Sequence, residues 1–183
     1  ELTSEQLGNA KIVEEVKSGK IEIAPFDESR ITTNSYDLSL GETIIRYTAE
    51  FIDPKVETPY EEIKIPSDGL LLKPGEFVLG HSNERIGSDF YVPLIHGKSG
   101  TARMGLFVHV TADLIDIGSH GVTTFQLYAT LPVCLYPNIL IAQVSFWVPF
   151  GKIVLYEGKY QNSKGPRPSM TYKDFKYDVL KKR

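Results

Sequence analysis

The chain has 183 residues, with 20 Lys or Arg against 23 Asp or Glu, so its formal net charge at pH 7 is −3. This balance lacks the basic surface that nucleic-acid binding requires, and we expect no nucleic-acid partner. No apolar run approaches the roughly 18 to 20 residues of a membrane span, and we expect no membrane association. The length suits a single domain over residues 1–183.

The cysteine content indicates a reducing environment. Cys134 is the single cysteine, so an internal disulfide is excluded. The opening residues, ELTSEQLGNA, show no signal-peptide pattern. We therefore expect a cytoplasmic protein.

Residues 4–18 fit one amphipathic helix, with Ser4 as a possible N-cap and Gly19 as the residue that ends it. The apolar residues expected on roughly one face are Leu7, Ile12, Val13 and Val16.

After this helix the chain consists of short runs rich in β-branched and aromatic residues. The runs are KIEIAPF, SYDLSLGETIIRY, GLLLKPGEFVLGHS, DFYVPLIHG, LFVHVTADLIDIG, GVTTFQLYA, LPVCLYPNILIAQVSFWVPF and GKIVLYEGK. Turn residues separate them about every ten positions, which predicts an all-β sandwich or barrel. KPGE at 73–76 and YPN at 136–138 are expected to form tight turns.

Residues 157–183 differ from the rest of the chain. They begin with EGKYQNSKGPRPSMTYKDF, which is polar and contains glycine and proline. Because this segment is too poor in apolar residues to pack alone, it is either loose or laid over another part of the protein.

The stretch HGKSGTARMG at residues 96–105 contains the last three letters of a phosphate-binding P-loop. A P-loop needs a glycine five residues before Gly97 and a long helix directly after the serine. Position 92 is a valine within a predicted strand, and Gly100 and Thr101 open a helix poorly. A P-loop is therefore excluded, although the question of phosphate binding stays open.

Zinc chemistry and serine hydrolysis also find no support in the sequence. A zinc deaminase needs a His or Cys near a Glu and then Pro-Cys-x-x-Cys, which one cysteine cannot supply. No G-x-S-x-G elbow occurs. The histidines are scattered without ligand spacing and are expected at the surface or partly buried: His81, His96, His109 and His120.

Residues 98–103 gather groups that suit an anion. Lys98, Ser99, Gly100 and Arg103 place two cations, a hydroxyl group and flexible backbone within six residues. Farther along, Asp116 precedes glycines that allow backbone to approach a ligand closely. The alternative is a basic surface turn followed by a strand, and the spacing alone leaves both interpretations open.

At these residues the chain resembles the dCTP deaminase branch of the deaminase and dUTPase superfamily. GKSGTARMGLFVHVTADLIDIGSHGVTTFQL is similar to that branch's pattern G-[RK]-S-S-x-[AG]-R-x-G-L-x-x-H-x-T-A-x-x-I-D-x-G-x-x-G-x-x-x-L-E. PFDESRITTNSYDLSLG is similar to P-F-x-x-x-x-[IV]-x-x-[SA]-S-x-D-[LV]-x-L-G. LKPGEFVLG, LYPNILIAQVSF and GKYQNSKGPRPS continue the resemblance in the same order, so it spans nearly the whole chain.

The resemblance implies a mainly β, distorted jelly-roll-like β-barrel of the dUTPase-like β-clip type, with an N-terminal helix and few short helices. It implies a homotrimer with three sites between subunits. Each site would bind a deoxynucleoside triphosphate (dCTP, dUTP or dTTP) that carries Mg²⁺ on its phosphates, without zinc and without direct protein ligands to the magnesium. The polar tail, residues 157–183, would close over the site.

The resemblance also assigns roles to individual residues. Lys98 and Ser99 match the family's triphosphate-binding residues, and Gly100 stands where the family has a second serine. Arg103 matches an arginine that a neighbouring subunit contributes to the catalytic pocket. Asp116 stands where the family holds the deoxyribose and, in dUTP-hydrolysing members, activates water.

Further substrate contacts are implied before and after this segment. The backbone of Ala112 matches the group that reads the pyrimidine edge, and Gln143 corresponds to a base-contacting glutamine. Tyr156 and Lys159 match phosphate contacts from the closing tail. Ser163 stands where many relatives have a glutamine that touches the triphosphate.

One residue breaks the family pattern at the chemistry itself. The family keeps a glutamate in the context L-E to move protons during deamination at C4 of cytosine, and the matching residue here is Gln126. An amide cannot shuttle a proton at neutral pH. Loss of a general base typically costs on the order of 10² to 10⁴ in rate.

The sequence thus predicts a zinc-independent hydrolase that converts dCTP to dUTP and ammonia for dUMP and dTTP supply, with activity lowered by Gln126. Three interpretations of that residue remain: a substitution engineered to trap a nucleotide, a natural dUTPase forming dUMP and pyrophosphate through Asp116, or a catalytically silent nucleotide-binding regulator. The further departures at Gly100 and Ser163 favour a divergent natural member over a single point mutant.

Overall fold

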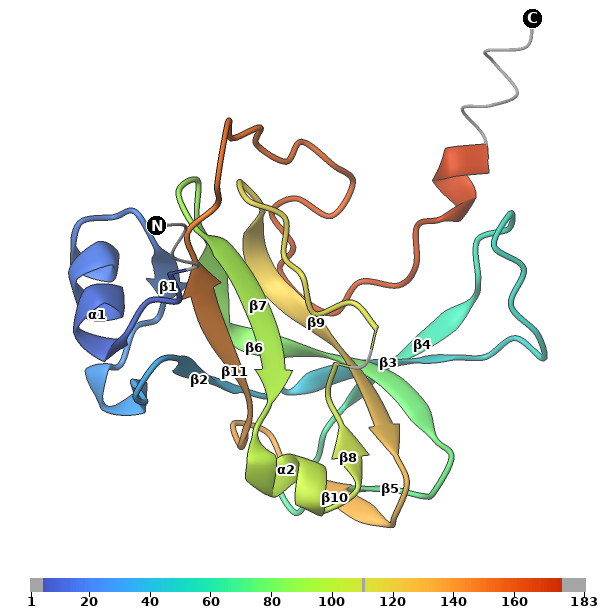
Figure 1. Cartoon of the computed structure of the whole chain (residues 1–183). Coiled ribbons are helices and arrows are strands. Elements are labelled where there is room, and N and C mark those ends of the chain that lie inside the picture. The colour runs from blue at the N-terminus through green and yellow to red at the C-terminus, as the bar shows by residue number, and fades with distance from the viewer. Residues whose placement is uncertain (1–4, 110, 176–183) are drawn as a thin grey trace, which may run out of the picture.

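The computed structural model describes residues 5–109 and 111–175. Figure 1 shows a protein built mainly of strands, with few and short helices. Its elements are α1 (Asn9–Lys17), β1 (Glu22–Ala24), a 3₁₀ turn (Glu28–Arg30), β2 (Tyr36–Ser39), β3 (Thr43–Tyr47), β4 (Tyr60–Lys64), β5 (Leu70–Leu72), β6 (Phe77–Gly87), β7 (Val92–Gly97), α2 (Ser99–Arg103), β8 (Leu106–Phe107), β9 (His120–Ala129), β10 (Val133–Leu135) and β11 (Leu140–Trp147).

The strands pair antiparallel in three sheets. The largest has the order β4-β3-β6-β9-β8, with β1 also paired to β6. A second sheet has the order β2-β11-β7, and β10 pairs with β5. The prediction of a mainly β, distorted fold with an N-terminal helix and few short helices is confirmed.

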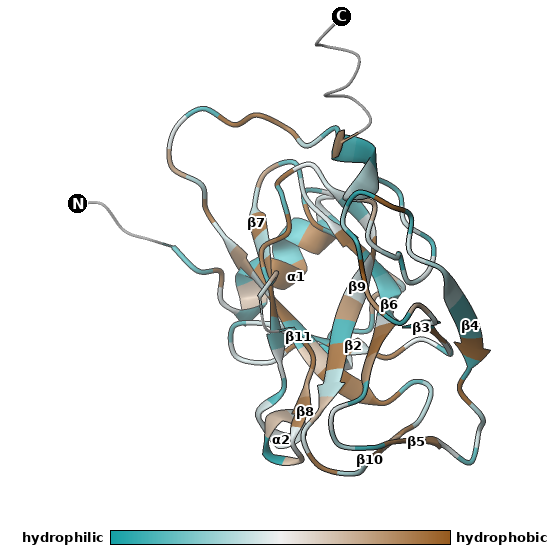
Figure 2. Cartoon of the chain, turned by 90° about the vertical axis from the view of Figure 1, so that its right-hand side faces the viewer, coloured by the Kyte–Doolittle hydropathy of each residue, from teal (hydrophilic) through white to brown (hydrophobic). Residues whose placement is uncertain are grey.

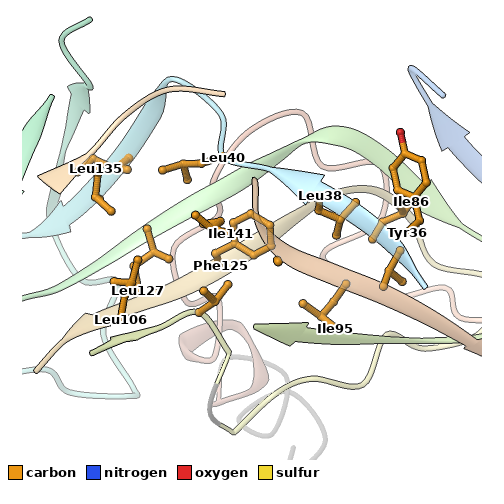
Figure 3. Packing of buried hydrophobic residues seen from close by; sticks show 14 of the residues in the cluster. Tyr36, Leu38, Leu40, Ile86, Ile95, Leu106, Phe125, Leu127, Leu135 and Ile141 are labelled. Carbon is orange, nitrogen blue, oxygen red and sulfur yellow. The ribbon is translucent and has the colours of Figure 1, made fainter. Parts of the chain in front are cut away.

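The core lies where the two larger sheets meet. Figure 3 shows Leu38, Ile95 and Ile141, from β2, β7 and β11, beside Ile86 and Phe125 from β6 and β9. All of them are almost fully buried. Burying side chains of this size contributes about 1.5 to 3 kcal/mol each, which holds the sheets together.

Strand β9 shows how the sequence directs side chains to two faces. Phe125 and Leu127 are fully buried in the core, whereas Thr124 and Gln126 lie on the opposite face and border a cavity. This alternation follows from the two-residue period of a strand. Figure 2 likewise shows hydrophobic and hydrophilic segments interspersed along the strands.

Helix α1 is shorter than predicted, because residues before it are extended. Leu7 N–H donates to Phe146 C=O over 2.9 Å, so this part of the chain lies along β11. The helix therefore begins at Asn9 after Gly8 and is not capped by Ser4, which lies outside the described residues. Gly19, with φ 78°, ends it as expected.

Two other expectations about strands were wrong. In the run 106–118 only β8 forms, and residues 151–159 form no strand, with Val154 76% exposed. Conversely, β4 was missed because its sequence, YEEIK, is polar and mostly exposed and shows no apolar alternation.

The predicted turns are present. In KPGE, Glu76 N–H donates to Lys73 C=O over 3.1 Å and Gly75 has φ 86°. In YPN, Asn138 has φ 67°. After β7 a helix does form at residue 99, but α2 is only five residues long, which agrees with the exclusion of a P-loop. None of the described helices is long and apolar enough to cross a membrane.

Candidate active site

A cavity of about 550 Å³ lies beside β6 and β9. Its wall is completed by the loop between β8 and β9 and by residues of the segment 156–169. Figure 1 shows this segment, in orange and red, looping beside the start of β9. Most of the lining is apolar, so a bound ring would be shielded from water while a few polar groups set its orientation.

Five of the predicted site residues border this cavity. They are Ala112, Asp116, Gln126, Tyr156 and Ser163. The structure therefore brings together residues from the β8–β9 loop, from β9 and from the C-terminal tail.

The other predicted residues do not line the cavity. The Lys98 ammonium forms an ion pair with the carboxylate of Asp37. Gln143 Oε1 accepts a hydrogen bond from Ser35 Oγ over 2.8 Å, and Gln143 lies opposite Asp37 in the β2–β11 pair. Lys98 and Gln143 thus belong to the second sheet, away from the cavity wall.

Helix α2 and the tail hold the remaining predicted residues. Ser99 and Gly100 are exposed, and Arg103 donates from a guanidinium nitrogen to the Ser99 carbonyl over 3.1 Å. The Lys159 ammonium forms an ion pair with Asp174. Within one chain, then, the predicted site is divided into a cavity group and a group around α2 and β11.

Gln126 has a defined orientation at the cavity. Its Nε2 donates to the Thr124 carbonyl over 3.2 Å, which fixes the other amide atom as the oxygen. That Oε1 is buried and has no hydrogen-bond partner among the described residues. A buried unsatisfied acceptor is costly, so the site favours a ligand or water that donates a hydrogen bond there.

Asp116 stands at the exposed side of the cavity. Its carboxylate has no hydrogen-bond or ion-pair partner among the residues that the structure describes. Gly118, two positions on, has φ 86°, and a Cβ there would lie 2.8 Å from Leu155 Cβ. This turn needs glycine, and it leaves the carboxylate free to bind a hydroxyl group or to orient water.

Two of the histidines, which the sequence gave no role, also line the cavity. Burial lowers the pKa of His109, despite backbone hydrogen bonds from Val108 and Ala112 that oppose this effect, so its ring is neutral at pH 7. Only its position in the family pattern singled it out. His120 occupies a variable position of that pattern, so no sequence signal marked it.

The tail is attached to the start of β9 by several hydrogen bonds. Gln161 accepts from the His120 N–H over 2.7 Å and donates to the Gly118 carbonyl over 2.7 Å. Val122 N–H donates to the Ser163 carbonyl over 3.0 Å. Gly121 permits this approach, since a Cβ there would lie 2.7 Å from Ser163 N.

A small charge cluster supports the same attachment point. The His120 ring lies 2.7 Å from Glu22 Oε2 through Nδ1 and 3.0 Å from Asp89 Oδ1 through Nε2. Burial lowers the pKa of His120, but the hydrogen bonds with Asp89 and Glu22 outweigh it and raise the pKa above its ordinary value. Arg85 also binds Glu22 over 3.0 Å.

We expect this cluster to make stability depend on pH. Because the folded-state pKa of His120 is raised, its contribution is complete below the ordinary pKa of about 6.5 and is lost as the pH rises through the folded value. The unfolding free energy of the unmodified protein should therefore exceed that of His120→Gln at pH 5.5 and approach it at pH 8.5, by under about 1 kcal/mol because the groups are partly exposed. Urea unfolding across this range measures it, and a pH-independent difference would contradict it.

Among the described residues, no group of three or more His, Cys, Asp or Glu side chains is placed to hold a metal ion. Any divalent cation at this site would thus be held mainly by groups of the ligand.

The comparisons with known proteins agree with this site. The model of the dCTP deaminase-like family matches residues 6–148. The chain is 45% identical over 170 residues to the "dCTP deaminase, dUMP-forming" of Clostridium beijerinckii, covering 92% of this chain and 98% of that protein. It is 44% identical over 156 residues to the protein of the same name from Clostridium botulinum, covering 85% and 90%.

A solved structure supports the fold. The crystal structure of 2′-deoxycytidine 5′-triphosphate deaminase from Agrobacterium tumefaciens superimposes with a TM-score of 0.64 at 22% identity, over 80% of this chain. The chain spans about half of that longer one, 49%. Together with the family model, which matches most of the sequence, these relatives establish that the chain belongs to the dCTP deaminase-like family.

Proposed function

We propose that the chain binds pyrimidine deoxynucleoside triphosphates and acts on dCTP without zinc, as a hydrolase whose deamination step is impaired by Gln126. The observation that carries this proposal is the cavity, which places Gln126 and Asp116 in one wall of a chain 45% identical to a protein named as a dUMP-forming dCTP deaminase. The role would be to supply deoxyuridine nucleotides for thymidylate synthesis.

Deamination of cytosine adds water at C4, protonates the ring nitrogen and releases ammonia. A carboxylic acid can accept and return these protons, whereas the Gln126 amide can only accept or donate hydrogen bonds. Its buried Oε1 suits the 4-amino group of cytosine, which is a donor. The residue thus favours binding of dCTP and slows its conversion.

Asp116 supports a second step, in which dUTP and water give dUMP and pyrophosphate. Its carboxylate lies at the cavity without a partner among the described residues, so it is free to take a proton from the attacking water. The name of the Clostridium relatives, dUMP-forming, favours this step. We propose that Asp116 retains it.

We also propose a homotrimer in which a neighbouring subunit completes each site with Lys98, Ser99 and Arg103. The separation of these residues from the cavity group in one chain supports this arrangement. So does an exposed aromatic pair, Phe107 and Tyr128, which are 43% and 37% exposed and stack with centroids 6.1 Å apart. Such a surface is typical of an interface.

In this proposal the nucleotide arrives as its Mg²⁺ complex, and the tail, residues 157–183, closes over it. The contacts of Gln161 and Ser163 with β9 support the closing role, while residues 176–183 lie outside the described part. The single cysteine accords with a cytoplasmic location.

Incubation with dCTP and with dUTP, each with Mg²⁺, tests the proposal. We expect pyrophosphate from dUTP at an ordinary enzymatic rate and ammonia from dCTP only slowly, because Asp116 is present and the carboxylate at position 126 is not. Ammonia and pyrophosphate are measured separately. If neither appears while dCTP or dTTP raises the melting temperature, the chain is a nucleotide-binding regulator, an outcome that Gln126 alone would explain.

A further inference from the structure

One cation borders the cavity without any role assigned to it. Arg167 is the only Lys or Arg among the described residues that line the cavity. Its guanidinium group forms no ion pair or hydrogen bond with any residue in the described part of the chain. A charge with no partner beside a mostly apolar cavity is therefore available to a ligand.

The backbone at this position is fixed. Arg167 N–H donates to Thr124 Oγ1 over 3.0 Å, and Thr124 lies two residues before Gln126 on the same face of β9. Pro166 and Pro168 flank Arg167 and restrict the chain on both sides. The guanidinium thus projects from an anchored point, so less entropy is lost when it binds.

The other tail groups expected to bind phosphate are engaged within the chain. Lys159 is paired with Asp174. Ser163 is only 5% exposed, and its hydroxyl donates to the Tyr160 carbonyl over 2.8 Å. On the α2 side, Lys98 is paired with Asp37. A triphosphate bound at this cavity would need a cation from its own chain that these residues do not supply.

Arg167 also borders a second, polar cavity that includes Glu42 and Glu62. Neither carboxylate forms an ion pair with it, since Glu42 is paired with Lys64 and Glu62 has no recorded ion pair among the described residues. The acidic neighbours therefore leave the guanidinium unneutralised.

From these observations we propose that Arg167 is a phosphate-binding residue that the tail supplies to the cavity of its own chain. The ligand class is a nucleoside 5′-triphosphate, whose oxygens a guanidinium group binds in bidentate fashion. This inference rests on the proposed function and adds to it the in-chain contact that compensates for Gly100 and Ser163.

Titration calorimetry with Mg²⁺-dCTP and with uncharged deoxycytidine tests the assignment. Arg167→Ala should weaken dCTP binding at least about tenfold, with a smaller loss at high salt, while deoxycytidine binding stays unchanged. Arg167→Lys should retain part of the affinity, because an ammonium keeps the charge but not the fork. Lys152→Ala, which removes an exposed cation outside the cavity, should bind both ligands as the unmodified protein does.

The opposite results are distinct from each other. If Arg167→Ala binds dCTP as tightly as the unmodified protein, the assignment is wrong and the proposed function stands. If it loses dCTP and deoxycytidine equally, Arg167 positions the tail and does not bind phosphate. If the unmodified protein binds no dCTP at all, both the assignment and the proposed function fail.

Discussion

Gln126→Glu should raise the rate of ammonia release from dCTP by on the order of 10² to 10⁴, the usual contribution of a general acid–base group. The new carboxyl group would occupy the place of an amide that donates to the Thr124 carbonyl over 3.2 Å. Only a protonated acid can keep that bond, so the carbonyl and the partial burial both raise the pKa of the new group. A raised pKa suits a group that must give a proton to the ring and to the departing ammonia.

A coupled assay for ammonia measures this change, and Gln126→Ala is the matched control, because it removes the amide without adding an acid. We expect the alanine variant to release no more ammonia than the unmodified protein. If Gln126→Glu binds dCTP but releases no additional ammonia, position 126 is not the missing base, or further parts of the site have been lost.

The fold was largely accessible from the sequence where a strand has one buried face. In β9, alternation identified Phe125 and Leu127 as core residues and left Gln126 for the other face. The same reasoning failed for β4, which is exposed at an edge, and for the apolar run 106–118, which lines the cavity instead of pairing in a sheet. Periodicity reports burial, and neither segment is buried as a strand is.

The site was accessible only in part. Ala112, Asp116 and Gln126 lie close together along the chain, so one motif indicated them together. The ion pair of Lys98 with Asp37 joins residues 61 positions apart, and no local pattern predicts it. Arg167 was missed for the same reason, since its place depends on how the tail lies along β9.

Asp116→Asn should reduce pyrophosphate release from dUTP by at least about 10²-fold, because an amide can hold the ribose hydroxyl but cannot accept a proton from water. Since the two side chains are nearly the same size, dUTP affinity should change little. Pyrophosphate release and dUTP binding, measured on the same preparation, separate the two effects. A variant that hydrolyses dUTP normally would show that another group activates the water.

The same variant tests whether the site is shared between subunits. Arg103→Ala, which alters only the α2 group, should also be inactive by itself, because Arg103 does not line the cavity of its own chain. In trimers formed by co-expressing the two variants, Asp116 of one chain would meet Arg103 of another, and pyrophosphate release should return to a fraction of the normal rate. A site complete within one chain predicts no recovery, since every chain in the mixture would carry one defect.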